Sequence, residues 1–267
     1  MTSGTTPGGE LPAAATSGTA AAAPAVPPWF RAVVWDSLLG ALCLLLPIPL
    51  VDDMLLGRMR RRMVERVAAR WQVTLSPAQL ALLAGGGRRS LGRFLLKAAI
   101  YPVKELLRKV LYFLAIKDAV DTFSLLFHQG YLLHAALSRG ALGNVRAADD
   151  ASGRGGPVDD AWVAATAAAV HGALAATDTR PLQRLLVGVL RNSRQLLRAT
   201  VRWLASRLGG RRDAAPAVTA LADEGATRQQ LGSPEAEQLL DRLLLALWGE
   251  RGYLDRLDAE LARRLWF

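Results

Sequence analysis

An uncharged run at residues 37–51 (SLLGALCLLLPIPLV) is the feature that most constrains how this chain can fold. As one continuous helix its 15 residues extend roughly 22 Å, whereas the apolar core of a bilayer is roughly 30 Å thick. Pro47 and Pro49 shorten the helical part further, because proline disfavours helical geometry in the residue before it. The run is too short for a simple membrane span. It fits either the core of a soluble bundle or a segment that enters a membrane only partly.

The remaining apolar segments have the lengths and spacing of helices. Hydrophobic residues make up 51% of the chain, and most of them are Ala and Leu, which favour helix over strand. Proline and glycine clusters separate the apolar runs, and no stretch shows the alternation of a half-buried strand. The sequence therefore predicts an all-α, multi-helix bundle. Its expected helices lie at about 28–46, 52–71, 77–84, 90–100, 102–138, 159–177, 180–208, 234–249 and 253–265.

Composition divides the chain into four parts. Residues 1–28 are almost entirely Gly, Ser, Thr, Ala and Pro, which cannot bury enough apolar area to offset the entropy of ordering. We therefore predict a disordered low-complexity arm there. Residues 141–157 are rich in small and polar residues and are predicted to be a linker. The other two parts are a helical domain at 29–140, with the apolar run and basic helices, and a C-terminal helical bundle at 158–267.

Positive charge is concentrated in two zones. The whole chain has a formal net charge of +10 at pH 7. Residues 58–112 hold 13 lysines and arginines against Glu65 and Glu105, and residues 178–212 hold nine arginines against Asp178. Residues 213–267 instead contain ten acidic residues and six arginines. Zones of this kind attract anions such as anionic lipid, nucleic-acid phosphates or an acidic protein partner.

The first basic zone follows the apolar run within a few residues. A short apolar segment beside arginines is typical of a protein that inserts shallowly into a membrane while the guanidinium groups stay at the level of anionic headgroups. We therefore expect a non-enzymatic protein that associates peripherally with a membrane surface. The expected contact residues are Leu38, Leu42, Leu45, Leu46, Ile48, Leu50, Arg58, Arg60, Arg61, Arg62, Lys97 and Lys104.

One stretch carries a resemblance to a known family. Residues 46–77 (LPIPLVDDMLLGRMRRRMVERVAARWQVTLSP) contain a Pro-x-Pro step and an Asp after an oily helix, followed by the pattern Met-Val-x-x-Val-Ala at residues 63–68. This order resembles the opening of a helical domain of unknown function in bacterial membrane-associated proteins, often found beside a GTPase domain. The resemblance implies a helical module at the cytoplasmic face of a bacterial membrane. It assigns no functional residue.

The same residues allow other interpretations. The apolar run can be a core helix of a soluble bundle, and the arginines after it an ordinary solvated helix face. A soluble adaptor could use the basic helices to dock an acidic protein partner. The arginines at 180–207 could also bind nucleic-acid phosphates without sequence specificity, although few aromatic residues lie among them and no recognition motif is found.

Four polar residues interrupt the apolar face of the helix predicted at 102–138. Helical spacing places Lys117, Asp118, Asp121 and His128 on the same side as the leucines and valines before them. Charged groups in an apolar stripe must be paired or hydrogen-bonded, unless the helix leaves the core there. The functional hypothesis is a polar pocket in which Asp121 and His128 form an acid/base or ligand pair. The alternatives are an interhelical salt bridge and a rotation of the buried face.

No motif in the sequence indicates catalysis or metal binding. His128 and His134 are six residues apart, so on a helix they point about 120° from each other, and His171 lies in another segment. The sequence GGGRRS at 85–90 lacks the Gly-Lys-Ser/Thr ending of a phosphate-binding loop and is interpreted as the stop of one helix before the next. We predict no enzymatic activity, no metal and no cofactor. Cys43 is the only cysteine, which excludes an internal disulfide.

Overall fold

The computed structural model describes residues 26–45, 52–85, 108–140, 158–208, 220–223 and 232–265. All regular secondary structure in these ranges is helical, which confirms the predicted all-α fold. The low-complexity arm up to residue 25, the predicted helix at 90–100 and the predicted linker at 141–157 lie outside the described residues. The helices are α1 (Pro28–Cys43), α2 (Asp52–Arg70), α3 (Pro77–Leu83), α5 (Arg108–Ser138), α6 (Asp160–Ala176), α7 (Arg180–Asn192), α8 (Arg194–Leu208), α10 (Pro234–Gly249) and α11 (Arg251–Leu265).

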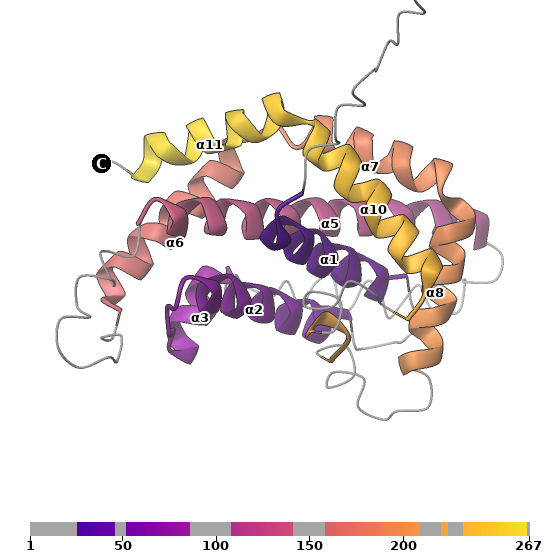
Figure 1. Cartoon of the computed structure of the whole chain (residues 1–267), viewed down its shortest axis with the longest axis horizontal. Helices are drawn as coiled ribbons and strands as arrows, with labels where there is room; N and C mark the ends of the chain where they lie inside the picture. The colour runs from indigo at the N-terminus through magenta and orange to yellow at the C-terminus, as the bar shows by residue number, and fades with distance from the viewer. Residues whose placement is uncertain are drawn as a thin grey trace, which may run out of the picture.

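The long helix α5 is the centre of the arrangement. Figure 1 shows it running the length of the molecule, with α1 beside it, α2 and α3 on one side and α10 and α11 on the other. Helices α6 and α11 pack together, and α7 and α8 lie with α10 towards the other end. Within the described chain, α5 contacts α1, α2, α6, α7 and α11. Its apolar residues therefore face several helices at once, which explains why no single amphipathic stripe describes this helix.

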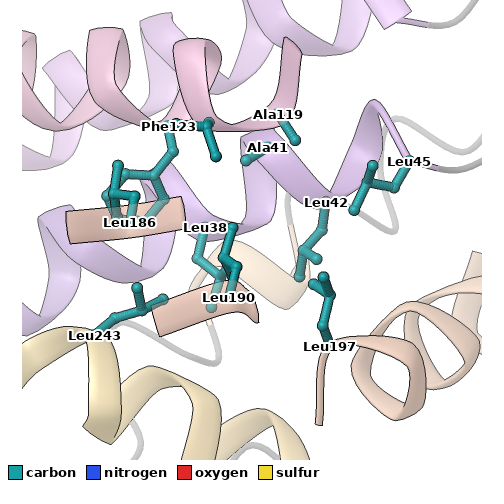
Figure 2. Close-up of a pocket in the computed structure, with 11 residues that line it drawn as sticks. Leu38, Ala41, Leu42, Leu45, Ala119, Phe123, Leu186, Leu190, Leu197 and Leu243 are labelled. Carbon is teal, nitrogen blue, oxygen red and sulfur yellow. The ribbon is translucent and has the colours of Figure 1, made fainter. Parts of the chain in front are cut away.

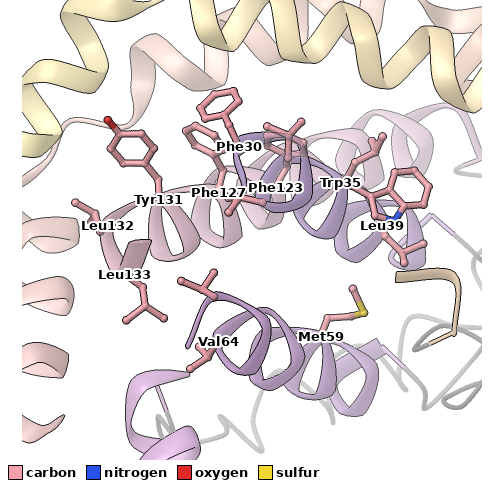
Figure 3. Packing of buried hydrophobic residues seen from close by; sticks show 14 of the residues in the cluster. Phe30, Trp35, Leu39, Met59, Val64, Phe123, Phe127, Tyr131, Leu132 and Leu133 are labelled. Atoms are coloured by element: carbon pink, nitrogen blue, oxygen red, sulfur yellow. The ribbon is translucent and has the colours of Figure 1, made fainter. Parts of the chain in front are cut away.

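One hydrophobic cluster contains residues from both predicted helical regions. Phe30 and Trp35 of α1 and Phe127 of α5 are fully buried, and Figure 3 shows Phe30 beside Phe127, with Trp35 further along α1 near Leu39. The same cluster continues to Leu240 of α10 and Leu257 of α11. The predicted boundary at 141–157 therefore does not separate two cores, because α1 and α5 pack directly against the C-terminal helices.

Glycine allows the helices to pack closely around α5. A Cβ atom at Gly130 would lie 2.8 Å from the sulfur of Met63 and 2.8 Å from a methyl group of Val33. Such a distance is far below van der Waals contact, so α5 reaches α1 and α2 at this level only because residue 130 has no side chain.

Short polar side chains cap the starts of several helices. Ser76 and Gln79 form a reciprocal capping box at the start of α3, where Gln79 N–H donates to Ser76 Oγ over 3.3 Å. Asp159 caps α6, and its carboxylate accepts the Ala161 N–H over 2.8 Å. These short polar side chains satisfy amide groups that the helix itself leaves without partners.

The helix predicted at 180–208 is wrong, because Ser193 divides it into α7 and α8. Ser193 has φ −114° and ψ 26°, outside the helical region, and its carbonyl accepts the N–H of Leu197 to begin the next helix. Its buried hydroxyl accepts a hydrogen bond from Arg242 of α10 over 3.0 Å. A tertiary contact from a distant helix thus fixes the break. Residues 190–196 around the break contain neither proline nor glycine, so the local sequence does not indicate it.

Candidate functional site

The structure does not bring the predicted polar pocket together. Lys117, Asp118 and Asp121 are exposed on α5, and Asp121 accepts a hydrogen bond from Gln183 of α7 over 3.0 Å. His128 lies two turns further along and has different partners. The pocket hypothesis is therefore corrected: around residues 117–121 the exposed side of α5 carries the charged groups, and the buried side carries Ala119, Val120 and Phe123.

His128 is a structural histidine with both ring nitrogens hydrogen-bonded. Its Nδ1 bonds to the carbonyl oxygen of Ser124, which requires Nδ1 to carry the proton, so Nε2 accepts the hydroxyl proton of Tyr253 on α11. Burial lowers the pKa of His128 to about 4, and burial raises the pKa of Tyr253. Both groups are neutral at pH 7. This pair joins α5 to α11 and leaves no ring nitrogen for a substrate or metal.

The apolar residues expected at the membrane are part of the protein core where the structure describes them. Leu38 and Leu42 of α1 are 2% and 1% exposed, and Leu45 is partly buried against the same cluster. Figure 2 shows Leu38 next to Leu190 of α7, and Leu42 directed towards Leu197 of α8. The expectation of lipid contact is corrected for Leu38 and Leu42, because α7, α8 and α10 cover the face of α1 that a membrane would have to reach. The expected contact residues Leu46, Ile48, Leu50, Lys97 and Lys104 lie outside the described residues.

Some arginines of α2 are exposed to solvent, and others are partly buried or form ion pairs. Arg58 and Arg61 are exposed, whereas Arg60 is half-buried. Arg62 forms ion pairs with Asp223 and, over 3.3 Å, with Glu65. The helix therefore presents only part of its charge to solvent.

A partly buried ion-pair network links α1, α2 and the short helical segment 220–223. Arg66 of α2 binds both carboxylate oxygens of Asp36 on α1, and its other terminal nitrogen binds Asp223 over 2.9 Å. The indole of Trp35 donates to the carbonyl oxygen of Leu221 over 3.2 Å, which fixes the same segment against α1. Asp36, a single acid within the apolar helix, is the sequence signal for this network. The sequence analysis did not use it.

The carboxylates of this network have opposite pKa shifts. Asp36 is 2% exposed, and burial raises its pKa to about 6 although Arg66 opposes the shift. Burial also disfavours the charged form of Asp223, but hydrogen bonds from Arg62 and Arg66 outweigh it and lower the pKa of Asp223 below its usual value. Both acids are predominantly ionised at pH 7. The network fixes the position of two helices and one segment, and its charges compensate one another.

The face formed by α7 and α8 is different, because its arginines face solvent. Residues 180–208 contain no Asp or Glu, and within the described part of the chain none of their arginines forms an ion pair. We call this surface the α7–α8 cationic face. Its exposed residues are Arg180, Arg184, Arg191, Arg194, Arg198, Arg202 and Arg207.

Apolar side chains lie among these arginines. Val187 of α7 is 40% exposed, and Leu185, Val189, Leu196 and Trp203 are partly buried at the edges of the face. The guanidinium group of Arg207 lies over the Trp203 ring at 5.9 Å. An arginine-rich surface with a discontinuous apolar margin can bind a layer of negative charge that has an apolar layer beneath it.

Among the described residues, no three His, Cys, Asp or Glu side chains are grouped so as to hold a metal ion. None of the described helices has the length and apolar composition needed to cross a bilayer. Comparison of the chain with protein-family models, curated proteins and solved structures finds no match. The resemblance of residues 46–77 to a bacterial membrane-associated helical domain stays a prediction.

Proposed function

We propose that this chain is a non-enzymatic helical protein that binds peripherally to an anionic membrane surface through the α7–α8 cationic face. The observation that carries the proposal is the exposure of seven arginines on two consecutive helices that contain no acidic residue. Each arginine held near an anionic bilayer contributes about 1 kcal/mol to binding. A few such contacts give binding that is reversible and sensitive to salt.

The composition of the face favours a membrane over nucleic acid. Proteins that bind single strands or RNA commonly present exposed aromatic rings on which bases stack. Trp203 is the one aromatic residue of α7 and α8, and it is partly buried against the protein core. Val187 and the partly buried leucines instead offer apolar contacts at the depth of the lipid headgroups. The cytoplasmic leaflet of a bacterial membrane, as the resemblance implies, is the proposed location.

Exposed Arg58 and Arg61 of α2 extend the charge that the protein offers to such a surface. The buried position of Leu38 and Leu42 changes the expected binding mode. We propose attachment by charge and by shallow apolar contacts of α7 and α8, without insertion of α1. A wash with high salt should therefore release the protein from membranes, because screening weakens interactions between solvent-exposed charges.

Co-sedimentation with lipid vesicles tests this function. The full chain is mixed with vesicles of phosphatidylcholine alone or with added phosphatidylglycerol, and the bound fraction is measured at low and high salt. We expect binding only to the anionic vesicles, with loss in high salt. A triple variant, Arg191→Gln/Arg194→Gln/Arg198→Gln, should bind about a hundredfold more weakly if each arginine contributes about 1 kcal/mol.

A matched variant removes the same charge elsewhere. Arg251, Arg256 and Arg263 are exposed on α11, and their replacement by Gln leaves the α7–α8 cationic face intact. This control should retain most of the binding. Equal losses in both triple variants would contradict a specific face, and tighter binding to a DNA duplex than to anionic vesicles would favour the nucleic-acid alternative. A chain that ignores both vesicles and DNA would contradict the proposal and favour the soluble adaptor.

A further inference from the structure

A second polar feature lies away from the α7–α8 cationic face. A cavity of about 120 Å³ opens where α2, the end of α3, α5 and α6 meet. One ordered water requires only ~10–15 Å³, so this space accommodates a group of several non-hydrogen atoms. Arg60, Gln129 and His171 supply polar groups to its lining, and Leu125 and Leu174 supply apolar walls.

His171 has an unsatisfied hydrogen-bonding atom at this cavity. Its Nε2 atom is buried and has no hydrogen-bond partner in the structure. A buried polar atom without a partner costs about 1–3 kcal/mol, so native proteins usually provide one. The backbone at Gly85 passes close to this ring: a Cβ atom at Gly85, which has φ +70°, would lie 2.9 Å from the imidazole Cε1. Only glycine permits the chain to pass this close to His171.

The other polar groups are fixed by the same four elements. Gln129 is 4% exposed and donates its Nε2 hydrogen to the carbonyl oxygen of Leu83 over 2.8 Å, which joins α5 to the end of α3. Arg60 reaches the cavity from α2 and is half-buried, whereas its neighbours Arg58 and Arg61 are exposed. A guanidinium group and an imidazole N–H that line the same partly open cavity provide charge and directed donors for an oxyanion.

We propose that this cavity binds a small oxyanion of the phosphate or carboxylate class, with Arg60 and His171 as its hydrogen-bond donors. The Nε2–H tautomer of His171 donates to one oxygen of the anion, and the Arg60 guanidinium donates to others and balances the charge. The apolar walls limit the ligand to a compact group. This site is independent of the proposed membrane function, since none of its residues belongs to α7 or α8.

Titration of the full chain with inorganic phosphate tests the site. The chain is titrated at constant ionic strength, with binding followed by isothermal calorimetry and by ³¹P line broadening, and a parallel titration with acetate distinguishes a phosphate from a carboxylate ligand. We expect saturable binding of one of the two anions to one site per chain. The bound anion should also raise the melting temperature. Absence of saturable binding for both anions would overturn the proposal.

Matched variants locate the bound anion. Arg60→Met and His171→Leu should each weaken binding about tenfold or more. The first removes the charge-assisted hydrogen bond of the guanidinium group to the anion, and the second removes the hydrogen bond from the imidazole Nε2–H. Arg58→Met, an arginine change on the exposed side of the same helix, should leave the affinity within about twofold, since it touches no cavity residue. The triple variant of the α7–α8 cationic face should likewise retain phosphate binding. Equal weakening in Arg58→Met and Arg60→Met would contradict the assignment.

A variant that unfolds is recognised by the loss of its helical circular dichroism. In that case His171→Gln replaces His171→Leu, because the amide keeps a donor at similar reach. Retained binding in His171→Gln supports the donor role. A folded His171→Leu variant that binds phosphate and acetate as the native chain does would refute that role. The titration of the native chain decides the existence of the site whether or not any variant folds.

Discussion

The two arginine-rich regions of this chain resemble each other in sequence and differ in their surroundings. In α2, Arg62 and Arg66 turn towards Asp36 and Asp223, and Arg60 lines a cavity. In α7 and α8 the arginines face solvent without ion pairs among the described residues. The acids that make the difference come from distant parts of the chain. A run of arginines therefore does not by itself identify a binding surface.

The largest expected effect is the loss of stability on replacing Arg66. Replacing it by Met leaves Asp36 buried without its cation, so the free energy of unfolding should fall by about 3 kcal/mol. Urea denaturation followed by circular dichroism measures this change. The control is Arg61→Met on the exposed side of α2, which should change the free energy of unfolding by less than about 0.5 kcal/mol. Similar losses in both variants would show that the position of an arginine on α2 is irrelevant to stability.

The second difference is in the pH dependence of stability. The pKa of Asp36 is about 6 in the folded chain, against an ordinary value of 3.8, so between these values the folded state holds a proton that the unfolded chain has released. The contribution of Asp36 to stability is therefore fully present below about pH 4, and about 2–3 kcal/mol of it is lost as the pH rises through 6. His128 and His134, whose pKa values are lowered to about 4 by burial, act in the opposite direction.

The variant Asp36→Asn separates these effects, because it removes the carboxylate and leaves both histidines in place. Urea denaturation of the native chain and of this variant is compared at several pH values from 4 to 7. The difference in the free energy of unfolding between the two, native minus variant, should decrease across this interval. A difference that does not depend on pH would show that burial does not raise the pKa of Asp36.

A smaller change is expected for Arg62, whose pair with Asp223 is partly exposed. Arg62→Met should lower the free energy of unfolding by about 1 kcal/mol or less, because solvent screens the pair. Salt provides the check: 0.5 M sodium chloride should reduce the difference between the native chain and Arg62→Met. It should affect Arg66→Met less, since Asp36 is buried. Equal salt effects on both variants would remove the distinction between the exposed and the buried pair.

Local sequence patterns predicted the helices well and the tertiary surroundings poorly. The starts of α3 and α6 depend on neighbours within a few residues, since Ser76 and Asp159 cap them, and both helices begin where the sequence predicted. The break at Ser193 depends on Arg242, and the burial of Leu38 and Leu42 depends on α7, α8 and α10. Information of that kind is spread over distant residues, so helical periodicity alone does not contain it.

Dependence on distant residues also explains why the surroundings of the candidate site residues could not be predicted from the sequence. Spacing placed Asp121 and His128 two turns apart on the apolar side of one helix, but it could not show that Asp121 is exposed and meets α7 while His128 is buried and meets α11. The acidic Asp36 within an apolar helix and the glycine at residue 85 before two further glycines were visible signals. Their partners Arg66 and His171 became evident only when the packing of α1, α2, α3 and α6 was known.

The smallest expected effect on stability, and a clear effect on binding, belong to the α7–α8 cationic face. Arg198 is exposed and has no ion pair within the described chain, so Arg198→Gln should change the free energy of unfolding by less than about 0.5 kcal/mol. Its binding to phosphatidylglycerol vesicles should nevertheless weaken roughly fivefold, the equivalent of about 1 kcal/mol.

Arg66→Met, tested at a temperature and urea concentration at which it stays folded, should show the opposite pattern: lower stability with vesicle binding within about twofold of the native chain. Its guanidinium already binds Asp36 and Asp223, so its loss removes little of the charge available to a lipid surface. If Arg198→Gln destabilises the fold while Arg66→Met weakens vesicle binding, then the α7–α8 cationic face supports stability and α2 supports lipid binding, the reverse of what their contacts imply. The distinction between compensated and available arginines would then fail for this protein.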